Sequence, residues 1–145
     1  MVKEFNSLEE IEEYYDIETN TYIFKEDGEH IDLVIFNFDL NVEANIDAYD
    51  IEACDINAWD INACNINADN IKARDVHASN INAWNIDAYN IKAGDINAWN
   101  IDACDISYWA VCFAYNSIKC KSIKGRRRNS KHFVLDGKLE VEGNE

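Results

Sequence analysis

The sequence has no proline, few basic residues and no long apolar run. Without proline, every residue can donate its backbone N–H to a β-ladder. No apolar stretch approaches the roughly 20 residues that span a bilayer, and the acidic start lacks the apolar core of a signal peptide. Acids outnumber bases 28 to 13, which argues against direct nucleic-acid binding because phosphate groups repel such a body. We expect a cytoplasmic protein, in a bacterium or a phage-infected cell, without membrane contact.

The residues that carry catalysis and metal binding show no recognisable arrangement. The five cysteines have no CxxC spacing, and their odd number indicates free thiols in a reducing compartment. The three histidines are scattered, and no Ser-His-Asp, phosphate-loop or metal-ligand pattern occurs. The sequence therefore predicts no catalytic residue, no metal site and no cofactor.

A five-residue repeat fills the middle of the chain, from Asn45 to Asp105. Each unit reads Asn or Asp, Ile, any residue, Ala, any residue, and Val76 is the one departure in the Ile slot. Ile and Ala are two residues apart, so on an extended backbone both point inward. Asn and Asp accept left-handed dihedrals, which predicts a turn at their slot. A fixed short period indicates a repeat solenoid.

The repeat resembles that of the pentapeptide-repeat proteins, whose units combine Ala, Asp or Asn, and Leu or Phe. The resemblance covers roughly residues 40–125, although here the large Ile46 precedes the small Ala48, the reverse of the family order. It implies an all-β fold, a right-handed quadrilateral β-helix with four pentads in each coil. It also implies a non-enzymatic activity, the mimicry of duplex DNA by an acidic rod, as in the quinolone-resistance members that bind DNA gyrase.

The first of three expected parts is an N-terminal cap, residues 1–38. A short helix is predicted at residues 7–15, because Ser7 and Glu10 form a capping-box pattern. Two strands should follow, joined by a hairpin that turns at Asp27-Gly28. A repeat array exposes an apolar end, so this part is expected to plug it.

The second part, residues 39–125, is the pentapeptide-repeat β-helix, in which two residues are inserted after Val111. The third part, residues 126–145, reads as a basic loop and a C-terminal hairpin cap that turns at Asp136-Gly137. The loop begins with Arg126, Arg127 and Arg128, which are either solvated or in contact with nucleic acid or an acidic partner.

With four pentads per coil, residues twenty apart would stack on one side of the rod. This folding places Asp47, Asp69 and Asp87 on one acidic side. Trp and Tyr side chains point outward, where they either cover neighbouring backbone or offer a contact surface. The candidate partner-binding residues are Asp47, Asp69, Asp87, Trp59, Trp84, Trp99, Tyr49 and Tyr89.

The few bases of the repeat are predicted to share another side. Lys72, Arg74 and Lys92 fall together when the chain is folded by twenty. Beside them the same folding stacks a column of carboxylates from Asp55, Asp75 and Asp95. The column indicates a ladder of ion pairs or, more weakly, a divalent-ion site.

Two functions of different class are consistent with these features. The first is an acidic DNA mimic that inhibits a nucleic-acid-binding enzyme, either a host-defence nuclease complex (an anti-CRISPR or anti-restriction role) or gyrase. Its partner would be a protein with a basic nucleic-acid groove. The alternative is a structural or adaptor module that binds through its aromatic surface or its end caps. A homodimer through the C-terminal cap is a further possibility.

Overall fold

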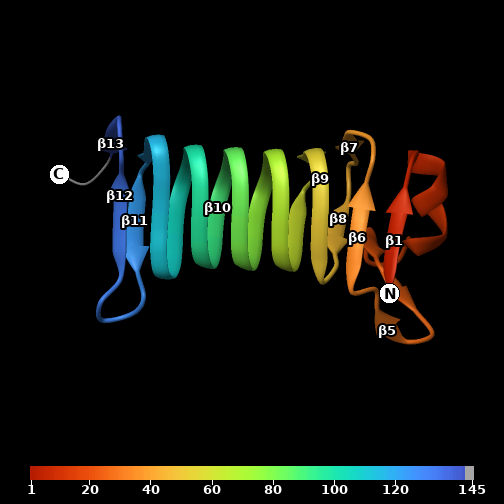
Figure 1. The fold of residues 1–145 in the computed structure, drawn as a ribbon. Coiled ribbons are helices and arrows are strands. Elements are labelled where there is room, and N and C mark those ends of the chain that lie inside the picture. Colours follow the sequence, from red (N-terminus) through yellow and green to blue (C-terminus); the bar gives the residue numbers. More distant parts are fainter. Residues whose placement is uncertain (143–145) are drawn as a thin grey trace.

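The computed structural model describes residues 1–142 as a rod of stacked β-coils with a helical cap at one end (Figure 1). The rod is a β-solenoid of about six turns, which confirms the predicted fold class. The elements in chain order are β1 (Val2–Phe5), the 3-10 helix η1 (Leu8–Tyr14), β2 (Tyr15–Asp16), β3 (Thr21–Ile23), β4 (Lys25–Glu26), β5 (Glu29–His30), β6 (Leu33–Phe36), β7 (Leu40–Asn41), β8 (Asn45–Asp47), β9 (Asp50–Asn57), the continuous β10 (Asp60–Cys120), β11 (Ser122–Gly125), β12 (Lys131–Val134) and β13 (Lys138–Val141).

Each coil contains three pentads, not the four that the family resemblance implied. β9 and β10 pair in parallel with Asn65 opposite Asp50 and Ile71 opposite Ile56. Both pairs are offset by fifteen residues, so the prediction of a quadrilateral coil is wrong. The error has a physical reason: every pentad carries the same inward pattern, so any multiple of five places Ile over Ile. The number of pentads that closes a coil depends on the interior volume, and the five-residue period carries no information about that volume.

The three sides of the rod are named here by the pentads that stack on them. Side A contains the pentads that begin at Asn45, Asp60, Asp75, Asn90 and Asp105. Side B contains the pentads that begin at Asp50, Asn65, Asn80 and Asp95. Side C contains the pentads that begin at Asp55, Asn70, Asn85 and Asn100.

The Ile and Ala slots form the interior, as predicted. The Ile side chains from Ile46 to Ile106 are at most 2% exposed. The Ala slots are buried too, except Ala53 and Ala73, which are half-buried and pack against the core. Burial of each Ile contributes about 1.5–3 kcal/mol of hydrophobic stabilisation. One large and one small side chain per side therefore fill a narrow coil without polar groups inside.

The Asn/Asp slot forms hydrogen-bonded ladders along the rod instead of left-handed turns. Among residues 1–142, Asn20 and Asp27 are the non-glycine residues with positive φ, and both precede the repeat. On side C, an Asn Nδ2 repeatedly donates to the Oδ1 of the coil before it, at 2.7–2.9 Å, from Asn116 back to Asp55. Because Asn donates and accepts whereas an ionised Asp only accepts, Asp can begin a ladder but cannot extend it.

The ladder predicts that Asn85→Asp lowers the free energy of unfolding by about 1 kcal/mol, which urea unfolding would measure. The carboxylate still accepts from Asn100 but no longer donates to Asn70. The matched control is Asn97→Asp, the same chemical change at an exposed outward slot of side B. An equal loss in both variants would mean that charge, and not the ladder bond, is responsible.

The N-terminal segment contains a short 3-10 helix and a hairpin turn at the predicted places, but the strands of the hairpin are only two residues long, and β3 and β6 pair with β8 and β9 instead of with each other. In η1, the Ser7 N–H donates to the Glu10 carboxylate at 3.2 Å, which completes the capping box. β4 and β5 pair in antiparallel orientation, with Asp27 (φ 51°) and Gly28 (φ 81°) at the turn. Positive φ at both turn residues is the geometry that matches the twist of a two-residue hairpin.

An aromatic plug closes this end of the solenoid, as expected. The rings of Phe5, Tyr14, Phe24 and Phe36 are buried, with neighbouring centroids 5.3–5.9 Å apart. The predicted boundary at residue 38 does not separate cap from coil, because β6 pairs in parallel with β9 and β3 with β8. The cap is therefore built on the first strands of the solenoid itself.

The C-terminal hairpin that was predicted is not present. β12 and β13 each pair in parallel with β10, and they form two sides of the last coil. The Asp136-Gly137 step is a corner of that coil, where a Cβ on Gly137 would lie 1.5 Å from the Asn116 carbonyl oxygen. The hairpin prediction failed because an Asp-Gly pair also suits a tight corner between two parallel rungs.

Two single-residue insertions widen the coil near its end. The Val111 N–H donates to Asp95 at 3.1 Å, sixteen residues earlier, so Cys112 and not Val111 occupies the inward slot. After the second insertion the offset is seventeen, as in Asp105 opposite Ser122, and in the last coil it grows to twenty for Val111 opposite Lys131 and to 21 for Ser117 opposite Lys138. The predicted start of the insertion after Val111 is therefore one residue late. Both extra residues lie between sides, where inward and outward alternation is already interrupted.

Candidate binding surfaces

The fifteen-residue offset separates the three acids that were predicted to share a side. Asp47 lies on side A, where it is opposite Asn62. Asp69 belongs to the side B pentad that begins at Asn65, and Asp87 to the side C pentad that begins at Asn85. The three carboxylates point in three directions, so the single acidic side built from them is wrong.

Asp47 and Tyr49 on side A contact the N-terminal hairpin. The His30 Nε2 lies 3.4 Å from the Asp47 carboxylate. The His30 ring also stacks on Tyr49, with centroids 4.4 Å apart and 14° between the planes. These two candidates therefore anchor β5 to the first coil.

Trp59 and Tyr89 lie on side C, on either side of Arg74 in the same column. The Arg74 guanidinium carbon is 4.4 Å from the Trp59 ring centroid, a cation–π contact. Tyr89 is 64% exposed. Together with Asn57, Lys72 and Asp87 these residues line a shallow groove of about 430 Å³. Of the predicted basic group, Lys72 and Arg74 do share this side, whereas Lys92 lies on side A.

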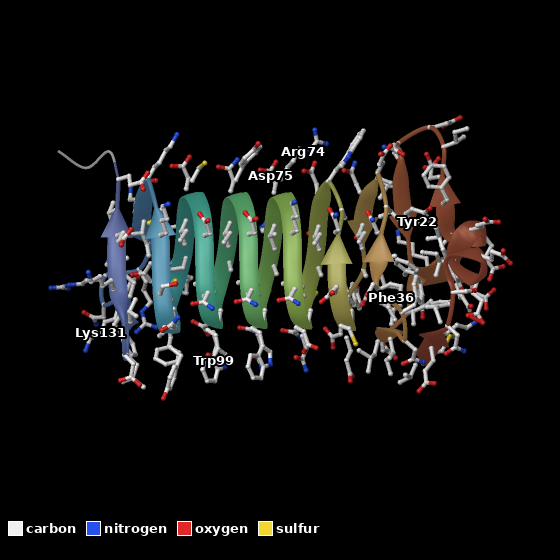
Figure 2. All side chains as sticks on the ribbon, turned by 90° about the horizontal axis from the view of Figure 1, so that it is seen from above. Tyr22, Phe36, Arg74, Asp75, Trp99 and Lys131 are labelled. Carbon is white, nitrogen blue, oxygen red and sulfur yellow. The ribbon has the colours of Figure 1, made fainter. Side chains whose placement is uncertain are left out.

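Trp84 and Trp99 are neighbours on side B, which folding by twenty did not predict. Their rings stack in parallel at 5.0 Å with 4° between the planes, although the side chains remain 55% and 42% exposed. Tyr115 continues the stack at 4.5 Å from Trp99. Figure 2 shows Trp99 and Arg74 on opposite edges of the rod, which places this stack away from the bases of side C.

The aromatic stripe, defined as Trp84, Trp99 and Tyr115, is widened by apolar residues of the last coil. Phe113 and Phe133 pack at 5.0 Å in the adjacent outward column. Phe133 and Leu135 are 46% and 57% exposed. Tyr115, Phe113, Phe133 and Leu135 were not predicted from the sequence as surface residues. Aromatic residues fifteen or sixteen apart were the available signal, but it acquires meaning only once the coil length is known.

Side B carries acids without bases over the four regular pentads. Asp50, Glu52, Asp69 and Asp95 lie on it. None of its four pentads, residues 50–54, 65–69, 80–84 and 95–99, contains Lys or Arg. Its outward slots between Ile and Ala continue as Asn67, Asn82 and Asn97. Side B is therefore acidic toward the N-terminal cap and aromatic toward the last coil.

The predicted column of Asp55, Asp75 and Asp95 does not form. The three residues begin pentads on sides C, A and B, and each accepts a hydrogen bond from the next coil on its own side. No group of three or more His, Cys, Asp or Glu within residues 1–142 is arranged to hold a metal ion. A groove of about 500 Å³ on side A includes Asp75, His77 and Lys92, in which carboxylate and base are mixed.

All five cysteines are free thiols, as the sequence indicated. Burial raises the pKa of the Cys112 thiol to about 12, with a smaller effect from Cys120. Burial also raises the pKa of the Cys120 thiol to about 11, with a smaller effect from the charge of Asp105. Both thiols are therefore protonated at neutral pH, which makes them poor nucleophiles.

The chain has no match among family models, curated proteins or solved structures. The resemblance to the pentapeptide-repeat proteins therefore stays a prediction drawn from the repeat. None of the helical segments within residues 1–142 has the length and apolar character that a membrane-spanning helix needs. Function must then be inferred from the surface of the rod.

Proposed function

We propose that the protein is a non-enzymatic, protein-binding solenoid and that side B is its contact surface. The observation that carries the proposal is the aromatic stripe. Trp84 and Trp99 stack on each other but leave about half of each side chain in solvent. Large aromatic side chains held rigidly at a surface lose little entropy on binding, and Trp and Tyr are the most frequent anchors of protein interfaces.

The charge of side B defines the class of partner. Its acids are Asp50, Glu52, Asp69 and Asp95, and the whole chain has a net charge of −15. Such a surface attracts a basic groove over distance and repels other acidic proteins. The partner is therefore a protein with a basic, nucleic-acid-binding groove, and the solenoid acts as its inhibitor by occupying that groove. A nuclease complex or gyrase is a partner of this kind.

The acids of side B resemble a DNA strand only in part. Asn67, Asn82 and Asn97 occupy outward slots where a continuous line of charge would need Asp. The proposed contact is for this reason divided, with carboxylates from the N-terminal half meeting bases and the aromatic stripe meeting an apolar rim. The alternative of a structural or adaptor module is favoured by one separate observation, the open last coil described below.

The proposal predicts that Trp84→Ala combined with Trp99→Ala weakens inhibition about thirty-fold, since an interface anchor contributes about 2 kcal/mol or more. The measurement is titration of the protein into a gyrase supercoiling assay and a Cas-nuclease cleavage assay. Both side chains are half exposed, so the variant should keep the circular dichroism spectrum of the parent.

The matched control is Trp59→Ala, which removes an aromatic residue of similar exposure from side C. It should leave inhibition within about twofold, as expected for a residue outside the interface. Equal weakening by Trp59→Ala would contradict a contact through side B. No inhibition of either enzyme at about 10 µM protein, a concentration that detects moderate affinity, would remove both as partners.

A further inference from the structure

The last coil has no strand partner on its outer edge among residues 1–142. β11, β12 and β13 each pair only with β10. Their outward N–H and C=O groups are therefore open to water or to another chain. The opposite end of the rod differs, because η1 lies over it (Figure 1). The aromatic plug fills the space beneath η1.

The same end exposes part of the apolar interior. Ile123, Val134 and Val141 point inward but are only half-buried, and Leu139 is 38% exposed. In the regular coils the inward Ile residues are at most 2% exposed. An uncovered terminal repeat of a solenoid favours association because its neighbour would bury this surface.

The segment that contains the last coil is basic, in contrast to the N-terminal segment. Residues 108–145 contain 8 bases and 4 acids, whereas residues 1–38 contain 2 bases and 11 acids. Arg127 and Arg128 lie on a turn that Ser130 fixes: the Arg127 N–H donates to the Ser130 Oγ at 2.9 Å, and that Oγ donates to the Trp109 carbonyl at 2.6 Å. Within residues 1–142 neither arginine forms an ion pair.

The far end of the rod is complementary in charge and in exposed apolar groups. η1 presents Glu9, Glu12 and Glu13 to solvent. Leu8 at the start of η1 and Ile17 after β2 are 41% and 81% exposed. We propose that copies of this chain associate head to tail, with the last coil of one molecule seated on the N-terminal cap of the next.

The charges select this arrangement over contact between two C-terminal ends. Two last coils face to face would bring their arginines together, and like charges across an interface cost several kcal/mol. A head-to-tail contact joins different surfaces, so each open assembly keeps one free N-terminal cap and one free last coil and can extend into a chain. It involves the ends of the rod and leaves side B open, and it does not depend on the proposed function.

Sedimentation of the whole chain tests the proposal. At about 1 mM protein, where even weak contacts form, the average mass should exceed twice the monomer mass of 16.7 kDa. It should fall toward the monomer when the ionic strength rises from about 0.05 M to about 0.5 M, because salt screens the pairing of Glu and Arg. A monomer at low salt and high concentration would overturn the proposal.

Charge reversal identifies the surfaces. Arg127→Glu with Arg128→Glu should weaken association at least about tenfold, and so should Glu9→Lys with Glu13→Lys. An equimolar mixture of the two variants should restore it, because each end again meets an opposite charge. The control, Lys72→Glu with Lys92→Glu, changes net charge as much as the arginine variant but on the flanks of the rod, and should associate like the parent. Unchanged association of the Glu9/Glu13 variant would overturn the head-to-tail arrangement in favour of a tail-to-tail dimer.

Discussion

Replacing Ile81 by alanine should lower the free energy of unfolding by about 3 kcal/mol, one of the two largest effects we expect. Ile81 is 1% exposed, and its neighbours in the interior are other Ile and Ala side chains. Branched side chains have few rotamers, and each is held by its own rung, so they cannot close over the space that is left. Urea unfolding followed by far-UV circular dichroism measures the loss.

The conservative change Ile81→Val serves as the control. It should cost about 1 kcal/mol, because one methylene is removed and the branched shape is kept. Val76 already occupies an equivalent slot and is 1% exposed. If alanine and valine gave the same small loss, the interior would be able to collapse around a cavity, contrary to a rigid packing of branched side chains.

A single residue inserted inside a side should cost at least about 3 kcal/mol. An alanine between Ile96 and Asn97 reverses the alternation that follows, which turns Asn97 and Trp99 inward and Ala98 outward. An amide buried without partners and a ring in a space sized for alanine are each unfavourable. If the strand bulges instead, the pairing of that rung is lost. Urea unfolding again provides the measurement.

The same alanine inserted at a corner, between Gly94 and Asp95, should cost less than about 1 kcal/mol, as surface changes usually do. Ala110 is a natural insertion between the same two sides. Trp109 ends the side A pentad that begins at Asp105, and Val111 stacks on Asp95 at the start of side B, so Ala110 is the extra residue between them. Near-equal losses for the two insertions would show that alternation within a side does not control stability.

The sequence was sufficient to predict the interior of this fold but not the size of its coil. Ile at every fifth position with Ala two residues later allows one inward pattern, and the burial of both slots follows from it. The number of pentads per coil, in contrast, does not follow from this pattern. At offsets of fifteen and of twenty alike, Ile lies over Ile and Asn or Asp over Asn or Asp, so the repeat satisfies both closures equally.

The prediction of the candidate surface was ambiguous for the same reason. Trp84 and Trp99 were identified individually as outward-facing, but whether they stack or lie on separate sides depends entirely on the coil length. The acids Asp47, Asp69 and Asp87 were outward-facing too, and the actual offset separates them. A residue's direction is a local property of its strand, whereas a residue's neighbours on a solenoid are a property of the closed coil.

Because three pentads close one coil, the number of repeats sets the orientation of everything that follows. Loss or gain of one pentad in the gene would turn the remaining surface by a third of a revolution while leaving the order of Ile and Ala unchanged. Loss or gain of three would shorten or lengthen the rod and keep its sides aligned. Recombination between near-identical repeats can therefore rearrange the exposed columns without altering the chemistry of the interior, so a lineage can explore new contact surfaces at little cost to folding.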